Sequence, residues 1–226
     1  MAALLTRLGH PAADAVHPIP NYTAMEILVA LVILGGAALL RSQLSVETPG
    51  TFQQVMETVV EFIRDMNEEI IGHGSSRYLA MIGTFGIFIG LCNILGLIPT
   101  LQTPTGHIEV TLGCAVAAFL YYNFQGFRQL GVLGYLKQMS GPIWWMAILM
   151  LPIEVVGNVG RLLSLSVRLY ANMFVGDILE VVFTGLVAIA VPAVFMALHL
   201  FVSLLQAYIF MLLPAIYISM AVSEEH

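Results

Sequence analysis

The sequence RLLSLSVRLYANMFVGD, from Arg161 to Asp177, places two arginines deep within a long apolar segment. Arg161 and Arg168 lie seven residues apart, and Asn172 follows the second arginine by four positions. A basic side chain at the centre of a bilayer costs roughly 2.5–3.5 kcal/mol on insertion scales, so it usually faces a partner, a cavity or an ion path. The segment therefore indicates a membrane helix that carries a functional site.

The composition is that of a membrane protein. The chain has 226 residues, of which 59% are hydrophobic and 10% are charged, whereas soluble domains carry about 25% charged residues. Eight lysines and arginines stand against fourteen acidic residues, a balance that argues against nucleic-acid binding. We therefore predict an all-α polytopic membrane protein, embedded in the lipid bilayer as a single domain of residues 1–226.

Apolar runs separated by polar stretches predict about five membrane-embedded helices. A bilayer core needs about 20 helical residues, so the two longest runs must tilt strongly. Residues 1–23 lack an apolar stretch of signal-peptide length and are expected to form an outer tail. The expected spans are residues 24–41, 78–99 and 110–125, followed by two long tilted helices at 142–186 and 191–222.

The segment at 51–71 predicts an amphipathic surface helix rather than a span. Its apolar residues recur every three or four positions, and its polar face is acidic. Attraction to anionic lipid is therefore not expected to hold it at the membrane. Two interpretations stay open, a helix that covers neighbouring spans and a docking face for a partner helix.

The basic residues predict the topology. They gather between the first two spans and after the third, while the loop at 99–109 has none. The positive-inside rule places residues 41–77 and 125–141 in the cytoplasm. The N-terminus is then outside, and the C-terminus is cytoplasmic if the two long helices make one round trip.

One face of the penultimate helix carries a polar stripe. Residues seven apart drift by about 20° per step, and residues four apart by about 40°, so they share a face. Asp177, nine residues after Arg168, points to the opposite face. The stripe covers about 27 Å of helix and consists of Glu154, Arg161, Ser164, Arg168 and Asn172.

The last helix has a matching polar face. His199, Ser203, Gln206 and Tyr217 follow one another at steps of four, three and eleven residues. In isolation such a face is typical of an interhelical hydrogen-bond seam. Beside a helix that bears Arg168, we favour a hydrated path.

Three motifs make the chain recognisable. The residues RLYANM from Arg168, with Gly176 and Asp177, resemble the RL(F/Y)xNMxxG(E/D) signature of subunit a of F-type ATP synthases. His199 and Gln206, with the ending SMAVSEEH, resemble that family's last helix, and NILGLIP from Asn93 resembles its NxxGLIP turn. The resemblance covers roughly residues 50–226. The chain departs from it at Asp177, where many relatives have Glu, and at residues 106–111.

The resemblance implies the proton-translocating stator subunit of the Fo sector. Such a subunit is not catalytic alone, needs no cofactor or metal, and serves the H+-transporting two-sector ATPase. The implied partners are the c-subunit ring, against which the two long helices pack as a hairpin, the b subunits and other Fo and F1 subunits. The implied location is the bacterial plasma membrane.

The resemblance also implies roles for individual residues. Arg168 would separate two aqueous half-channels and favour the deprotonated carboxylate of a passing c subunit. The other implied residues are Asn172 and Gln206 beside Arg168, Glu154 and Ser164 in the cytoplasmic half-channel, Asp177 and His199 in the outer half-channel, and His107 and Glu109 at an outer mouth.

Two other classes of membrane protein stay open. An unrelated ion channel or secondary transporter would show paired repeats or broken helices in both halves, and the sequence shows no such pattern. An intramembrane hydrolase would need a metal-binding HExxH, a Ser/His pair or paired aspartates. The chain has no HExxH, and His199, the single histidine deep in an apolar segment, lacks a convincing nucleophile.

Overall fold

The computed structural model describes residues 21–43, 50–72, 74–98, 103–140, 147–186 and 190–222, and these residues are helical apart from short turns. The fold is therefore all-α, as the sequence predicts. The expected outer tail lies outside the described residues, except for its last three positions. The helices are α2 (Asn21–Gln43), α3 (Thr51–Ile71), α4 (Leu79–Leu95), α5 (Ile108–Ser140), α6 (Ala147–Leu186) and α7 (Ala190–Val222), with 3-10 turns η1 (Ser75–Arg77) and η2 (Pro104–Gly106).

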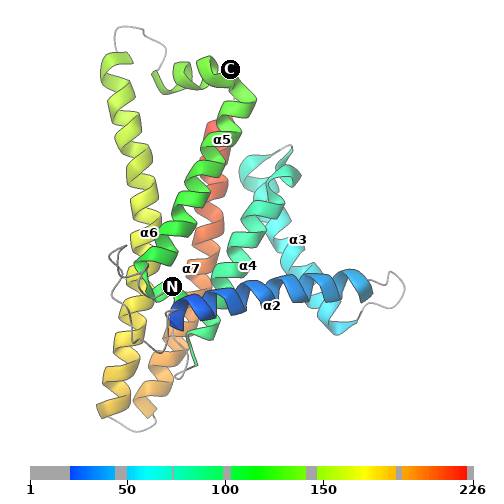
Figure 1. The fold of residues 1–226 in the computed structure, drawn as a ribbon, viewed down its shortest axis with the longest axis vertical. Helices are drawn as coiled ribbons and strands as arrows, with labels where there is room; N and C mark the ends of the chain where they lie inside the picture. The colour runs from blue at the N-terminus through cyan, green and yellow to red at the C-terminus, as the bar shows by residue number, and fades with distance from the viewer. Residues whose placement is uncertain are drawn as a thin grey trace, which may run out of the picture.

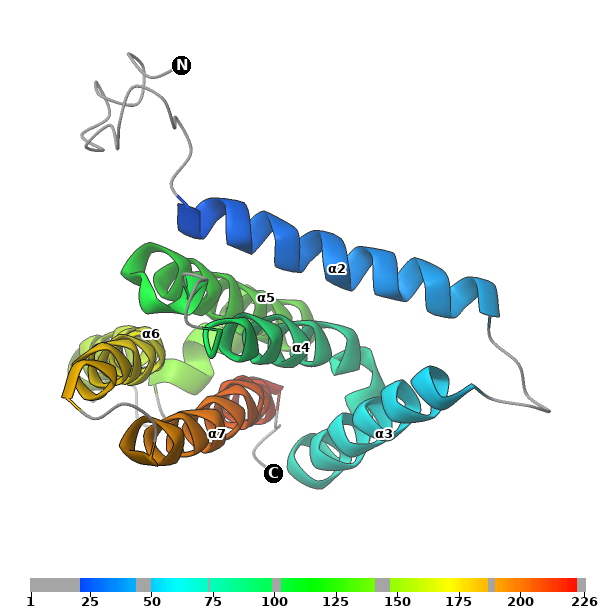
Figure 2. The same cartoon turned by 90° about the horizontal axis from the view of Figure 1, so that it is seen from below.

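Four helices form the body of the molecule. Helices α4, α5, α6 and α7 run along its long axis, with α5 packed on α6 and α4 packed on α7. Helices α6 and α7 are antiparallel and lie side by side as a hairpin (Figure 1). Helix α3 lies beside α4 and α7, and α2 crosses the body over α4 (Figure 2).

The lengths of α6 and α7 constrain how they sit in a membrane. Helix α6 has 40 residues, which at 1.5 Å per residue makes it about 60 Å long. A hydrocarbon core of about 30 Å accommodates that length only if the helix inclines by about 60° from the membrane normal. Helix α2, which is apolar and long enough to span a membrane, lies crosswise to the direction of α6 and α7, so the hairpin is strongly inclined if α2 is upright (Figure 1).

Helix α5 is longer than the sequence predicts. We expected a span at 110–125 and a cytoplasmic loop at 125–141, but the helix continues to Ser140 with a bend at Gly131. Gly131 has a φ of 71°, a left-handed conformation that glycine adopts without strain. Polar residues such as Gln125 and Arg128 mark where the apolar run ends, but a helix satisfies its own backbone and does not need to end there.

Helix α3 has the range that its periodicity predicts, and it packs through its second half. Ile63 and Met66 in the second half are 2% and 6% exposed, whereas Phe52 and Val55 in the first half are more than half exposed. Near its end, Ser219 of α7 donates a hydrogen bond to the Ile70 carbonyl at 3.0 Å. This bond satisfies one of the carbonyls that a helix C-terminus leaves unpaired. The second half of α3 thus covers neighbouring helices, while the first half leaves large apolar side chains exposed.

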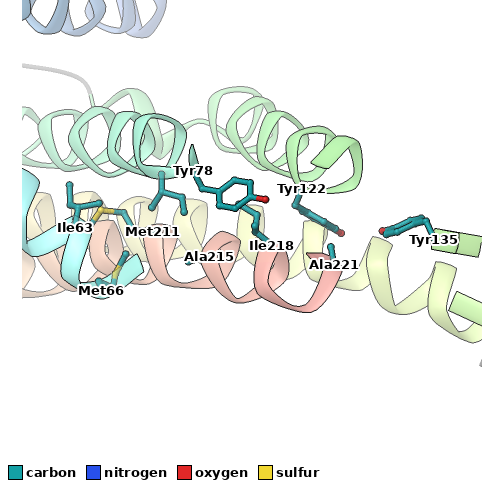
Figure 3. Packing of buried hydrophobic residues seen from close by; sticks show 10 residues of the cluster. Ile63, Met66, Tyr78, Tyr122, Tyr135, Met211, Ala215, Ile218 and Ala221 are labelled. Carbon is teal, nitrogen blue, oxygen red and sulfur yellow. The ribbon is translucent and has the colours of Figure 1, made fainter. Parts of the chain in front are cut away.

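Two apolar clusters hold the bundle together. The first joins α3, α4, α5 and α7 (Figure 3) and contains Ile63, Met66, Tyr78, Ile82, Tyr122, Tyr135, Met211, Ala215, Ile218 and Ala221. The second joins α4, α5, α6 and α7 and contains Ile89, Ala115, Ala118, Leu165, Leu169, Met173, Ala207 and Phe210.

Glycines allow α4 to approach its neighbours closely. A Cβ atom built at Gly86 would collide with the Met211 side chain of α7. At Gly90 a Cβ would lie 3.7 Å from the Ala207 Cβ, and at Gly83 it would lie 3.8 Å from Ile63. Small residues at this spacing let membrane helices pack backbone to backbone.

We expect Gly86→Leu to destabilise the fold by about 1–3 kcal/mol, because the added side chain overpacks the α4–α7 contact. The matched control is Gly35→Leu in α2, where a Cβ would meet nothing within 4 Å. Thermal unfolding of both variants in detergent provides the measurement. Equal midpoints for Gly86→Leu, Gly35→Leu and the unmodified protein would contradict the packing assigned to Gly86.

Candidate functional site

The inner side of α6 fixes the rotation of its polar stripe. Leu165, Leu169 and Met173 are at most 2% exposed and pack in the second apolar cluster. Because these residues face the bundle, Arg168 lies at its edge and is half-buried. The Arg168 Nη2 atom donates a hydrogen bond to the Ser164 hydroxyl at 3.4 Å, one turn earlier. Within the part of the chain that the structure describes, Arg168 has no carboxylate partner.

The centre of the α6–α7 hairpin is closed by a pair of carboxamides. Asn172 Nδ2 donates a hydrogen bond to Gln206 Oε1 at 2.8 Å, one turn along α6 from Arg168. Gln206 is fully buried, and its Nε2 has no hydrogen-bond partner among the described residues. The structure therefore brings together the two amides that the sequence predicts beside Arg168, and it leaves one buried donor available.

Toward the α6–α7 turn from this pair, polar groups of α6 and α7 are hydrogen-bonded to residues of α4 and of the segment at 103–106. Asp177 accepts a hydrogen bond from the Thr103 hydroxyl at 3.2 Å. Thr105, which lies in η2 two residues after Thr103, donates a hydrogen bond to Asn93 Oδ1 at 2.6 Å. Asn93 in turn donates to the Ser203 carbonyl at 3.2 Å. These bonds connect α6, η2, α4 and α7 through buried side chains.

His199 lies beside this network without a hydrogen bond of its own. It is 7% exposed, and neither ring nitrogen has a hydrogen-bond partner among the described residues. Its ring packs on Gly176, where an added Cβ would lie 2.5 Å from Nε2. A cavity of about 270 Å³ between α6 and α7 is lined by Asn172, Gly176 and His199 together with apolar side chains. The ring is therefore next to open space that reaches the amide pair.

A second cavity lies between α2, α4 and α5. It has a volume of about 510 Å³, and its lining includes the carboxylates of Glu26 and Glu109. His107, two residues before Glu109, stacks on the Tyr22 ring at a centroid distance of 4.1 Å. Gly106 lies next to His107, and a Cβ built there would come within 3.1 Å of Asp177 Oδ2. The cavity and the Asp177 network thus adjoin through η2.

At the other end of the stripe, Arg161 has partners on α6 and α7. It forms an ion pair with Glu154 at 3.6 Å and donates a hydrogen bond to Asn158 Oδ1 at 3.2 Å. Its guanidinium carbon lies 5.4 Å from the centroid of the Tyr217 ring. Tyr122 of α5 also donates to Asn158 Oδ1, at 3.1 Å. The two arginines of the stripe therefore have different surroundings.

The structure groups the predicted residues differently from the sequence. Arg168 contacts Ser164, and Glu154 contacts Arg161; the assignment of Glu154 and Ser164 to one half-channel, which the resemblance implies, stays a prediction. The described residues contain no group of three His, Cys, Asp or Glu side chains that could hold a metal.

Several residues of the network were not among the predicted site residues. Asn93 carried a signal, because it opens the NILGLIP motif, and Glu26 carried one as the single acid of the first span. The others are ordinary polar residues whose contacts arise only from packing. They are Thr103, Thr105, Tyr122 and Asn158.

Buried polar side chains that run through apolar helices can hold water and pass protons between hydrogen-bonding groups. Here polar side chains line the α2–α4–α5 cavity, where Glu109 is exposed, continue as buried groups through η2 to His199 and Gln206, and recur at the partly exposed Glu154. Arg168, a permanent cation, lies between the amide pair and Glu154 along α6.

Comparison with known proteins identifies the family. The family described as ATP synthase A chain matches residues 23–219. The chain is 42% identical over 226 residues to ATP synthase subunit a of Koribacter versatilis (strain Ellin345), with 100% of this chain and 92% of the relative covered. It is 45% identical over 214 residues to ATP synthase subunit a of Solibacter usitatus (strain Ellin6076), with 95% and 92% covered. These matches confirm the resemblance seen in the sequence motifs, and the chain belongs to the ATP synthase A chain family.

Proposed function

We propose that this chain is the proton-translocating stator subunit of an Fo sector, and that it works against a ring of c subunits. The observation that carries the proposal is Arg168, which has no carboxylate partner among the described residues and whose one hydrogen-bond partner there is the neutral Ser164 hydroxyl. A guanidinium stays protonated even when it is desolvated, so its charge needs compensation. A carboxylate on a passing c subunit would supply that compensation.

The chemistry of arginine fits this task. A fixed positive charge favours the ionised form of a nearby carboxylate, so it promotes proton release from the c subunit that arrives beside it. Arginine does not itself give up a proton, because a guanidinium stays charged even when it is desolvated. Its charge also repels protons that would otherwise cross directly between the two sides of the membrane. Arg168 would therefore keep two half-channels separate.

The outer half-channel would run from the α2–α4–α5 cavity to His199. Glu26 and Glu109 would attract protons at its mouth, and His107 would lie where the cavity meets η2. Asp177 follows, with its hydrogen bond from Thr103 at 3.2 Å. His199, whose ring nitrogens lack partners among the described residues, would complete the path, because an imidazole has one nitrogen that can donate a hydrogen bond and one that can accept.

The cytoplasmic half-channel would open at Glu154. Its carboxylate is partly exposed and lies 3.6 Å from Arg161. Ser164 would continue the path toward Arg168, to which it is hydrogen-bonded. The bond between Asn172 and Gln206 would fix the spacing of α6 and α7 beside the ring.

The proposed assembly includes the b subunits and other Fo and F1 subunits, and the chain would not be catalytic alone. The proposed location is a bacterial plasma membrane, because the relatives that define the family match are bacterial proteins. The distribution of lysine and arginine supports an outer N-terminus and a cytoplasmic C-terminus.

We predict that Arg168→Ala abolishes ATP-driven proton pumping in membrane vesicles while leaving assembly of the complex largely intact. The reason is that Arg168 is half-buried and bonded only to Ser164 among the described residues, so few structural contacts are lost. Pumping is measured as quenching of an acridine dye, and assembly as recovery of the complex with the c subunits. Assembled Arg168→Ala complexes that acidify vesicles at the unmodified rate would refute the role of Arg168.

Arg161→Ala is the matched control, because it removes the same side chain about 10 Å away on the same helix. We expect this variant to slow pumping without abolishing it, and to lower stability through the loss of its contacts with Glu154, Asn158 and Tyr217. If Arg161→Ala and Arg168→Ala abolish pumping equally, the special position of Arg168 is not supported.

A second prediction concerns Asp177 and His199. If they form one proton path, each change to Ala slows pumping more than it reduces assembly, because a titratable group is removed from a hydrated route. The exchange of both residues, Asp177→His with His199→Asp, is expected to retain measurable pumping. Vesicle acidification per assembled complex is the measurement.

The alternative to such a path is a structural contact that only fixes the α6–α7 hairpin. In that case both alanine variants would pump normally once assembled. That result would move the outer half-channel away from this pair, toward His107 and Glu109.

A further inference from the structure

Asn158 accepts hydrogen bonds both from α5 and from the polar stripe of α6. Its side-chain oxygen accepts a bond from the Tyr122 hydroxyl at 3.1 Å and a bond from Arg161 Nη1 at 3.2 Å. Asn158 is 6% exposed and Tyr122 is 3% exposed. Two donors thus converge on a single buried oxygen, and a buried donor that loses its acceptor is costly.

The position of Asn158 explains how Arg161 reaches Glu154. These two residues are seven apart, which places them two turns apart, whereas side chains on a helix normally pair at three or four residues. Helical side chains lean toward the N-terminus of the helix, so the Arg161 side chain runs back over the preceding turn. Asn158, three residues before Arg161, occupies that turn and binds the guanidinium on its way.

The guanidinium is then fixed from three directions. It is bonded to Asn158, lies 3.6 Å from the Glu154 carboxylate, and faces the Tyr217 ring of α7 at 5.4 Å. The Tyr217 ring in turn packs on the Tyr122 ring at a centroid distance of 5.7 Å. An arginine side chain that is only 27% exposed would otherwise choose among many rotamers, so the buried acceptor selects one.

We propose that Asn158 is a positioning residue, which orients the Arg161 guanidinium across the mouth at Glu154 and thereby sets the rate of proton passage at this end. The inference rests on the proposed function, because it assumes that protons pass there. Asn158 does not itself bind or release the translocated proton. It acts through Arg161, and Tyr122 supports it from α5.

Two substitutions at Asn158 separate the effect of its hydrogen-bond acceptor from the effect of its volume. Asn158→Asp keeps an oxygen that can accept both bonds, whereas Asn158→Leu keeps a similar size without an acceptor. We expect ATP-driven pumping per assembled complex to fall several-fold in Asn158→Leu and to be largely retained in Asn158→Asp. Tyr122→Phe, which removes one hydroxyl, is expected to give a smaller loss, and it tests the same node if Asn158→Leu fails to assemble.

The matched control is Asn123→Leu. Asn123 lies next to Tyr122 and also has two side-chain hydrogen bonds, to the Phe119 carbonyl and from the Tyr135 hydroxyl. Among the described residues Asn123 has no hydrogen bond or ion pair with Arg161, so its loss is expected to change stability rather than the pumping rate per assembled complex. If Asn123→Leu slows pumping as much as Asn158→Leu does, general disturbance of this region explains the effect and the proposal fails.

A double-mutant cycle tests whether Asn158 acts through Arg161. If it does, Asn158→Leu adds no further loss of pumping to Arg161→Ala, because its target is already absent. Losses that multiply independently would overturn the proposal, as would normal pumping by Asn158→Leu.

Glu154→Gln distinguishes this inference from the proposed function. If that variant pumps normally, the cytoplasmic path assigned to Glu154 is wrong, and the cycle between Asn158 and Arg161 still decides whether Asn158 orients the arginine. A non-additive cycle supports the inference, and an additive one rejects it, whichever way Glu154→Gln behaves.

Discussion

A polar side chain inside an apolar helix must find its partner within the protein or in water, because lipid offers none. This constraint organises the α6–α7 hairpin. Arg161 contacts Glu154, Asn158 and Tyr217, and Asn172 is hydrogen-bonded to Gln206. Tyr122 of α5 also donates to Asn158, so a few polar groups connect α5, α6 and α7. Arg168 differs, since a neutral hydroxyl is its one hydrogen-bond partner in the described part of the chain. The same constraint that fixes the bundle thus leaves the charge of Arg168 without a carboxylate partner among the described residues.

Such bonds between helices require short distances between their axes, and glycine provides them. Gly86 lets α4 lie against Met211 of α7, where any side chain would collide. Gly176 leaves the space that the His199 ring occupies. The close packing and the polar network therefore depend on each other. Without the glycines the buried polar atoms would be too far apart to bond, and without the bonds the helices would gain less from close contact.

Local features of this chain were predictable from its sequence, and contacts between distant segments were not. The 3.6-residue period gave the range of α3, and the seven-residue spacing gave the stripe of α6, because both depend only on helix geometry. The length of α5 was underestimated, since polar residues end a membrane span without ending a helix. The hydrogen bond between Asp177 and Thr103 joins residues 74 apart in the chain, and no local pattern encodes it. Asn158 was missed for the same reason, as its role appears only when Tyr122 is brought beside it.

The isolation of α2 bears on how the chain enters the membrane during synthesis. Beyond its first turns α2 stands apart from the bundle (Figure 2), and Leu31, Leu34 and Leu39 are each more than 60% exposed. Apolar side chains of this kind partition into lipid, so a helix that carries them can enter the membrane before the rest of the bundle has been made. Helix α6 is in the opposite situation. One of the groups that shelters Arg161 is Tyr217, which lies near the end of α7. Most of α7 must therefore be synthesised before Arg161 of α6 has all of its contacts.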